Sequence, residues 1–185
     1  HITELLDICK IPYGKKEKRK YIGAGPSVGS NDESYANGNE EDQNLDFQDV
    51  LGQSYGVRAA LIAAAGHHAL LFSGPAGTGK TMIAKRIPGI LPKMSKQEKL
   101  ELTKIYSIAS CLPSEKGLIA KRPFRAPHSA VSQNTILGGM SSGRLIPGEL
   151  ALAGKGVLFL DELPFFKKES IEALRGPMEE KRVTL

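Results

Sequence analysis

The sequence has few cysteines and no N-glycosylation site, and these shortages exclude several classes of protein. Only Cys9 and Cys111 are present among 185 residues. Two cysteines so far apart cannot build a disulfide framework, a cysteine-based zinc site or a CxxC redox motif, so we expect both to be buried free thiols. The sequence also lacks an Asn-x-Ser/Thr motif, which removes one sign of secretion.

The sequence lacks a long apolar run as well. The longest candidate, AALIAAAGHHALLF at residues 59–72, is interrupted by Gly66, His67 and His68. A membrane span needs about 18 consecutive apolar residues, so we expect a cytoplasmic protein without a membrane partner. Hydrophobic residues make up 41% of the chain, which is enough for the core of one domain of ordinary size.

Charge is unevenly distributed along the chain. Residues 80–128 contain eleven lysines and arginines against three acids, whereas residues 21–57 contain seven acids and no base. A local excess of eight positive charges suits a polyanionic partner such as DNA, although lysines on a solvated helix face give the same count.

The first 45 residues predict little globular structure. Leu5, Leu6 and Ile8 favour a short helix over residues 2–9. The basic run KKEKRK at 15–20 is typical either of a nucleic-acid patch or of a solvated linker, and we expect the linker. Residues 23–45 are rich in Gly, Ser, Asn and acids, which predicts a flexible linker.

Regular structure is predicted from residue 46 onwards. We expect a helix over 54–65 that ends at Gly66, followed by a short buried strand over 69–73. His67 and His68 fall in the turn between them, and without a second pair of ligands we assign them no metal chemistry.

Two further helices are predicted after the glycine-rich segment. The first covers residues 81–86 and is limited by Pro88. Ser95 and Glu98 form a capping-box pattern that starts the next helix, which we expect to run to about Ser110.

The remaining third of the chain alternates short strands and helical turns. In order, we predict a short strand at 122–128, a helical turn at 132–137, a glycine-rich hairpin at 138–148, a buried strand at 156–163, an amphipathic helix from 167 up to Gly176-Pro177, and the start of a strand at 182–185.

Residues 74–81, GPAGTGKT, match the P-loop pattern G-x-x-x-x-G-K-[ST] in full. The glycines allow successive backbone amides to converge on phosphate oxygens, and the helix that follows directs its positive dipole end to the same place. Lys80 would bridge the β- and γ-phosphates, and the Thr81 hydroxyl would coordinate Mg²⁺. The predicted ATP contacts are Gly74, Pro75, Ala76, Gly77, Thr78, Gly79, Lys80, Thr81 and Met82.

A second acidic element follows the apolar run Val157-Leu158-Phe159-Leu160. The run places Asp161 at the C-terminal end of a strand, where open α/β sheets bind ligands, so we assign Asp161 to Mg²⁺. Glu162 follows directly and would orient and deprotonate the attacking water. Glu162 and Lys80 are therefore the predicted catalytic residues.

With GPAGTGKT, DVLGQ and GVLFLDEL in view, the chain resembles AAA+ ATPases. Several long blocks resemble the magnesium-chelatase-like proteins of the ComM (YifB) group, namely IAAAGHHALLFSGPAGTGKTMIAKRIPGILP, RPFRAPHS, LIPGELALAGKGVLFLDELPFF and EALRGPMEEKRVTL. The resemblance covers about residues 46–185. One departure is visible: this family usually has RPFR-x-PHH, and Ser129 occupies the position of the second histidine, so a role that needs a histidine pair is in doubt.

The resemblance implies an α/β fold, the three-layer sandwich of P-loop NTPases with a central sheet of order 5-1-4-3-2. The hairpin at 138–148 would be the insert in helix 2, and residues 1–22 the end of a Lon-protease-like N-terminal domain. Strands 4 and 5, the arginine finger and the helical lid would follow Leu185. Since the first residue is His1 rather than methionine, we expect a piece of a longer protein that holds the N-terminal part of the ATPase domain and has little turnover of its own.

The implied activity is that of an ATP-driven motor. By resemblance, ATP and Mg²⁺ would bind between subunits of a hexameric ring that translocates on DNA, as a helicase or branch-migration factor in natural transformation. Two alternatives stay open: a motor that drives metal insertion into a porphyrin, and a scaffold that binds ATP without turnover. Porphyrin-stimulated ATPase activity would favour the first, whereas Glu162 argues against the second.

Overall fold

The computed structural model describes residues 45–112, 117–141, 143–180 and 182. These residues fall into two compact units that divide between Lys93 and Met94. The predicted helix over 2–9, the basic run 15–20, all but the last residue of the predicted linker, and the predicted strand at 182–185, apart from residue 182, lie outside the described residues.

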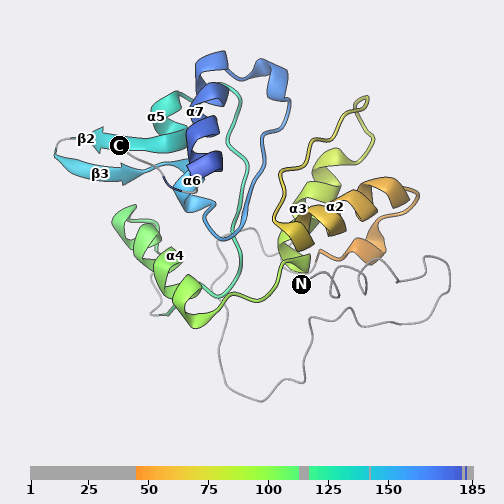
Figure 1. Ribbon diagram of the computed structural model, residues 1–185, viewed down its shortest axis with the longest axis horizontal. Helices are drawn as coiled ribbons and strands as arrows, with labels where there is room; N and C mark the ends of the chain where they lie inside the picture. The colour runs from red at the N-terminus through yellow and green to blue at the C-terminus, as the bar shows by residue number, and fades with distance from the viewer. Residues whose placement is uncertain (1–44, 113–116, 142, 181, 183–185) are drawn as a thin grey trace. The chain divides into compact units, whose positions relative to one another are not determined.

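Two helices form the body of the first unit (Figure 1). Helix α2 spans Ser54–Gly66 and helix α3 spans Lys80–Ile90, with the short 3-10 helix η2 at Phe47–Asp49 before them. Their core consists of Phe47, Val50, Val57, Ala60 and Ile83. The helix predicted over 54–65 is therefore confirmed.

The end of α2 differs from the prediction by one residue. Gly66 is still helical, and His67 is the C-cap residue in a left-handed conformation, with φ of 52° and its N–H donating to the Ala63 carbonyl. A side chain at position 66 would overlap the imidazole of His68 as it stands, but His68 is exposed and its ring can move aside.

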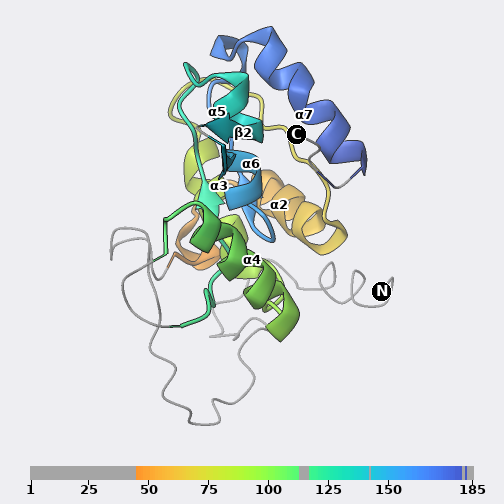
Figure 2. The ribbon, with the colours of Figure 1, turned by 90° about the vertical axis from the view of Figure 1, so that its left-hand side faces the viewer.

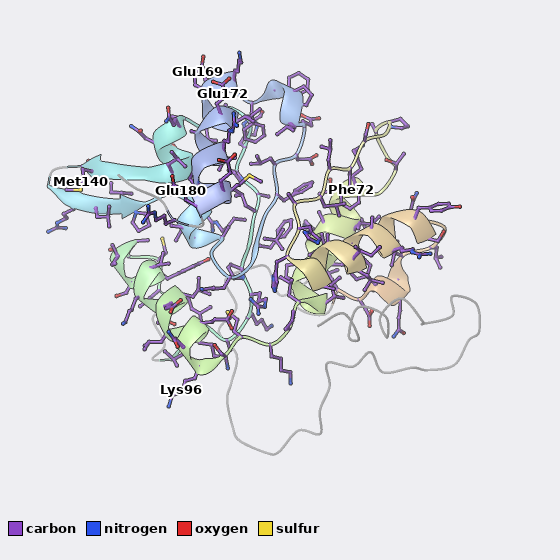
Figure 3. All side chains as sticks on the ribbon, viewed as in Figure 1. Phe72, Lys96, Met140, Glu169, Glu172 and Glu180 are labelled. Atoms are coloured by element: carbon purple, nitrogen blue, oxygen red, sulfur yellow. The ribbon has the colours of Figure 1, made fainter. Side chains whose placement is uncertain are left out.

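The buried strand predicted at residues 69–73 is wrong. The segment pairs with no strand among the described residues. Leu70 and Phe72 (labelled in Figure 3) pack against the core of α2 and α3, whereas Leu71 is 75% exposed. This alternation of partly buried and exposed side chains is typical of an extended segment that is covered on one face.

Helix α3 continues through Pro88, contrary to the predicted limit. Proline removes one N–H from the helical ladder, but only two residues, Gly89 and Ile90, follow it before the helix ends. Ile87 and Ile90 both pack against the core of the first unit, and this burial favours completing the last turn.

Helix α4, Lys96–Ile108, begins the second unit, and its predicted capping box is confirmed. The Ser95 hydroxyl accepts from the Glu98 N–H at 3.2 Å, and the Glu98 carboxylate accepts from the Ser95 N–H at 2.8 Å. The inner face of α4 carries Leu102 and Tyr106, which pack with Met94 and Leu152.

Two short sheets accompany the helices of this unit. Strands β1, Phe124–Arg125, and β4, Val157–Leu158, are parallel, with Phe124 opposite Val157. Both predicted strands exist, but each is shorter than predicted, and the second is half-buried rather than buried. A backbone hydrogen bond from the Phe159 N–H to the Arg125 carbonyl, at 2.8 Å, extends the pairing by one residue.

The predicted helical turn and hairpin are confirmed. Helix α5 spans Gln133–Leu137, and β2, Gly138–Ser141, pairs antiparallel with β3, Arg144–Pro147. Helix α6, Glu149–Leu152, follows directly.

The last helix, α7, spans Lys168–Glu180 after the 3-10 helix η3 at Leu163–Phe165. It lies beside α5 in both views (Figures 1 and 2), and Leu174 packs there with Ile136 and Phe166. The predicted end at Gly176-Pro177 is wrong, since the helix continues for three residues past Pro177.

Two properties of the described residues concern the predictions that were based on the lack of a long apolar run and on the shortage of cysteine. None of the helices among these residues is long and apolar enough to cross a membrane. Cys111, which follows the end of α4, is exposed rather than buried as predicted. Cys9 lies outside the described residues.

Candidate nucleotide-binding site

The glycine-rich loop of the first unit is curled, and its glycines take up the conformations that require them. Gly77 and Gly79 have φ values of 78° and 80°, in the left-handed region that L-residues rarely adopt. Nothing lies within 4 Å of a Cβ built at Gly77, so the conformation rather than crowding favours glycine there. Gly79 is the N-cap of α3 and offers no side chain to the helix.

Side chains of the loop itself hold the curl together. The Lys80 ammonium donates to the carbonyls of Gly74 and Pro75, at 2.9 and 2.8 Å, and the Thr78 hydroxyl donates to the Pro75 carbonyl at 2.9 Å. The lysine thus folds back over its own loop. Among the described residues it forms no ion pair with a carboxylate.

This arrangement fits an anion with several oxygens. The first N–H groups of α3 have no partner within the helix, and the helix dipole makes its N-terminus positive. Residues 74–77 and Thr81 are exposed, while Thr78, Gly79 and Lys80 are half-buried. Backbone donors, a cation that donates to two neutral carbonyls and an accessible loop together match the needs of a phosphate group.

Thr81 and Met82 complete the first turn of α3. The exposed Thr81 could offer its hydroxyl to a metal ion beside the loop. Met82 is half-buried in the core, and its methyl group covers Gly79, 3.1 Å from where a Cβ would stand. The methionine therefore supports the loop from the protein side.

Asp161 and Glu162 follow strand β4 in the second unit, and both are exposed. The Asp161 carboxylate accepts from the Glu162 N–H at 3.0 Å. Glu162 has φ of 52° and ψ of 49°, a left-handed conformation that is unfavourable for a residue other than glycine. Its carbonyl accepts from the Phe165 N–H at 2.9 Å, so the start of η3 maintains this conformation.

The side chains of residues 158–160, at the end of β4 and just after it, alternate between two environments. Leu158 and Leu160 pack against the core of Ile136, Phe166 and Leu174, whereas Phe159 stacks on Phe124 with 5.8 Å between ring centroids. Both faces of the segment before Asp161 are therefore fixed. The donor set at its end, two adjacent carboxylates, is of the kind that Mg²⁺ prefers.

An ion pair ties β1 to α6. The Arg125 guanidinium donates to both carboxylate oxygens of Glu149, each at 2.7 Å, and this pairing raises the pKa of Arg125. Nearby, the Tyr106 hydroxyl donates to the Leu152 carbonyl at 3.0 Å, and burial raises the pKa of the phenol, which keeps it a neutral donor.

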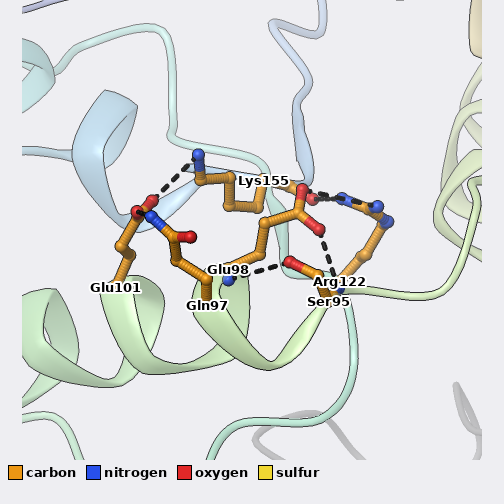
Figure 4. A network of polar contacts seen from close by, with 6 residues as sticks. All are labelled: Ser95, Gln97, Glu98, Glu101, Arg122 and Lys155. Atoms are coloured by element: carbon orange, nitrogen blue, oxygen red, sulfur yellow. Dashed lines mark hydrogen bonds and ion pairs between the residues drawn. The ribbon is translucent and has the colours of Figure 1, made fainter.

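A polar network connects the start of α4 to the turn before β4 (Figure 4). Lys155 pairs with Glu101 at 3.1 Å, and Arg122 donates to the Lys155 carbonyl and lies 3.9 Å from Glu98. The hydrogen bond from the Ser95 N–H lowers the pKa of Glu98, and the one from Lys155 lowers that of Glu101. This network fixes the turn from which β4 departs.

The structure brings the predicted residues together in two groups. Gly74 to Met82 form one group in the first unit, and Asp161 and Glu162 form another in the second. The prediction that Thr81 and Asp161 share a metal ion stays a prediction. Within the described residues, no three His, Cys, Asp or Glu side chains gather as a metal site, and His128 accepts from the Ala130 N–H at 3.2 Å.

Sequence reasoning missed Arg86 and the pair formed by Arg125 and Glu149. Arg86 is 9% exposed and contacts a residue 40 positions earlier. The available signal was its spacing, since position 86 lies three and four residues after Ile83 and Met82, which pack in the core. The pair spans 24 positions, and no local pattern marks it.

Comparison with known proteins gives a consistent set of relatives. The Competence protein ComM of Haemophilus influenzae is 47% identical over 137 residues, covering 73% of this chain and 26% of its own length. An uncharacterized protein YifB of Escherichia coli is 46% identical over 140 residues, covering 76% and 27%. An uncharacterized protein of Mycobacterium tuberculosis is also 46% identical, covering 76% and 28%. The chain spans about a quarter of the length of these curated relatives.

A family model agrees with these relatives. The model described as magnesium chelatase, subunit ChlI, matches residues 46–185, which include both the glycine-rich loop and the two adjacent acids. Together, the match over most of the chain and the blocks shared with its relatives show that this chain belongs to the magnesium chelatase family.

Proposed function

We propose that this chain is the ATP-binding and ATP-hydrolysing segment of a ring-forming AAA+ motor with a three-layer P-loop fold. The observation that carries the proposal is the glycine-rich loop, in which Gly77 and Gly79 are left-handed and Lys80 begins helix α3. The membership of the chain in the magnesium chelatase family supports a P-loop ATPase.

Each residue of the site has a distinct role in this proposal. Lys80 exchanges its two carbonyl partners for phosphate oxygens, and the amides of Gly77 to Thr81 bind the phosphates. When Mg²⁺ is bound, the Thr81 hydroxyl and the Asp161 carboxylate would be its protein ligands, and the ion would supply positive charge to the phosphates. Glu162 orients the attacking water and accepts its proton.

The experiment compares three forms of the full-length protein: the parent, Lys80→Ala and Glu162→Gln. We expect Lys80→Ala to lose ATP binding and Glu162→Gln to bind ATP without turnover. ATP binding by Lys80→Ala as tight as that of the parent would contradict the role of the loop.

We further propose that the substrate of the motor is DNA and that the complete ring is a hexamer acting as a helicase or branch-migration factor. The excess of positive charge over residues 80–128 supports a polyanionic partner, as does the printed name of the Haemophilus influenzae relative, a competence protein. Stimulation of ATPase activity by single-stranded DNA, weakening as salt is raised, is the expected result.

A second candidate is a motor that drives metal insertion into a porphyrin. The description of the family, magnesium chelatase, favours it. The two candidates separate in the same assay, since the porphyrin motor predicts ATPase stimulation by porphyrin and no effect of DNA. A protein that binds ATP with no turnover under either condition would favour a scaffold instead.

A further inference from the structure

Helix α3 carries a buried arginine six residues after Lys80. Arg86 is 9% exposed, although a guanidinium is one of the side chains least often buried. Taking such a charge out of water is unfavourable unless its donors are satisfied, so its partners define what the residue does.

The partners of Arg86 are mainly backbone carbonyls. Its Nε donates to the Asp46 carbonyl at 2.7 Å, and its Nη1 donates to the Met82 carbonyl at 3.0 Å. The nearest carboxylate is that of Asp49, at 3.6 Å from Nη2, and the Asp49 side chain is 60% exposed. The guanidinium therefore fixes the position of two main-chain segments more than it forms an ion pair.

The first of these segments is residues 45–50, which we call the strap. Phe47 and Val50 are 4% and 2% exposed and pack against α2 and α3. Asp46 and Asp49 cap the 3-10 helix inside the strap by accepting from the N–H groups of Gln48 and Asp46, respectively.

Phe47 and Val50 pack against α3, but an open cavity of about 130 Å³ remains along this contact, lined by Leu45, Asp46, Phe47, Arg86, Gly89 and Ile90. The hydrogen bond from Arg86 to Asp46 spans this region, where side-chain packing leaves space. Truncating the arginine would enlarge the cavity and leave the Asp46 carbonyl without this donor.

The second main-chain segment that Arg86 contacts is the first turn of α3, which continues directly from the glycine-rich loop. Met82 accepts from Arg86 through its carbonyl, while its side chain covers Gly79. In addition, the Ile83 N–H donates to the Gly79 carbonyl at 2.9 Å. Arg86 thus contacts Met82 directly. Met82 lies two residues after Lys80 and supports the loop.

We propose that Arg86 is a positioning residue for nucleotide binding, which holds the strap against the first turn of α3 and so keeps the glycine-rich loop in its curled form. The inference rests on the proposed function of the loop. Arg86 itself does not contact the phosphates in this account and acts through Met82 and Gly79.

The test uses Arg86→Met, which removes the charge, and Arg86→Lys, which keeps the charge but lacks the paired donors. Arg58→Met is the matched control, because Arg58 is exposed on α2 of the same unit. Two quantities are measured on the full-length protein: the Kd for a fluorescent ATP analogue, and amide hydrogen exchange over 46–50 and 77–83 without nucleotide.

We expect both Arg86 variants to exchange faster in these two segments and to bind the analogue about five- to tenfold more weakly, at the low end of the roughly 5–150-fold range that is typical of coupling between two sites. Arg58→Met should match the parent in both. If Arg86→Met does not fold, as judged by circular dichroism, Arg86→Lys decides the question.

The outcomes separate this inference from the proposed function. A parent that does not bind the analogue, or a Lys80→Ala variant that binds as well as the parent, would overturn the proposed function before any Arg86 variant is compared. If the parent binds and Lys80→Ala does not, folded Arg86 variants with the affinity and exchange of Arg58→Met would overturn the inference alone.

Discussion

Replacing Glu149 with glutamine should weaken the second unit by breaking the ion pair between β1 and α6. In the structure, two guanidinium donors of Arg125 reach the two carboxylate oxygens of Glu149, both at 2.7 Å. The Glu149 side chain is 17% exposed and that of Arg125 is 38% exposed. Glutamine keeps the shape and one acceptor but removes the charge.

The geometry sets the expected magnitude. A hydrogen bond to a charged group contributes about 1.5–3 kcal/mol when well buried, and exposed ion pairs contribute about 0–1 kcal/mol. Because Arg125 is more than a third exposed and Glu149 is not, we expect Glu149→Gln to lower the free energy of unfolding by about 1–2 kcal/mol, between those limits.

Urea denaturation followed by circular dichroism would measure this change. The matched control is Glu179→Gln, which breaks the exposed pair of Arg175 and Glu179 on α7, with 82% and 67% exposed side chains. We expect about 0.5 kcal/mol or less there. A double-mutant cycle with Arg125→Gln should give a coupling energy of about 1 kcal/mol. A coupling near zero, or equal losses in Glu149→Gln and its control, would refute the reasoning.

Three more predictions concern the support of β4. Ser95→Ala should lower the free energy of unfolding by about 1 kcal/mol in the same urea assay, because the capping oxygen of α4 is lost. Hydrogen bonding to Ser95 lowers the pKa of Glu98 below its ordinary 4.5. The stability due to that carboxylate is therefore present above pH 4.5 and is lost as the pH falls through the lowered pKa. Glu98→Gln should flatten the acid side of a plot of unfolding free energy against pH. Gly156→Ala should lower stability by about 1–3 kcal/mol, as its methyl group would overlap the Pro123 carbonyl, and an unchanged urea midpoint would contradict this.

The features that the sequence predicted correctly depend on neighbouring residues. The capping box joins Ser95 to Glu98, three positions apart, and glycines mark the hairpin of β2 and β3. Local chemistry determines both, so a short window contains the necessary information.

The features that the sequence did not predict depend on contacts between distant residues. Arg86 has the composition of a solvated helix residue, and only the strap 40 positions earlier explains its burial. The helices continue through Pro88 and Pro177, where proline chemistry alone predicts an end. For α3, the packing of Ile87 and Ile90 against the core of the first unit favours the continuation.

The candidate site also has features that local sequence predicts and features that depend on distant contacts. The pattern GPAGTGKT identifies the loop and its glycine conformations, because each glycine is required locally. The pattern GVLFLDEL identifies the acids but overstates the strand before them, since β4 covers Val157 and Leu158 in the described part of the chain and strand length depends on the partner strand.

The central claim is that the loop around Lys80 binds the phosphates of ATP. Isothermal titration of ATP with Mg²⁺ into the parent and Lys80→Ala chains, matched in folding by circular dichroism, tests it directly. We predict saturable binding by the parent and none by Lys80→Ala, since the variant lacks the one cation that the loop holds against neutral carbonyls. Equal affinity in the two chains, or no binding by a folded parent, would contradict the account.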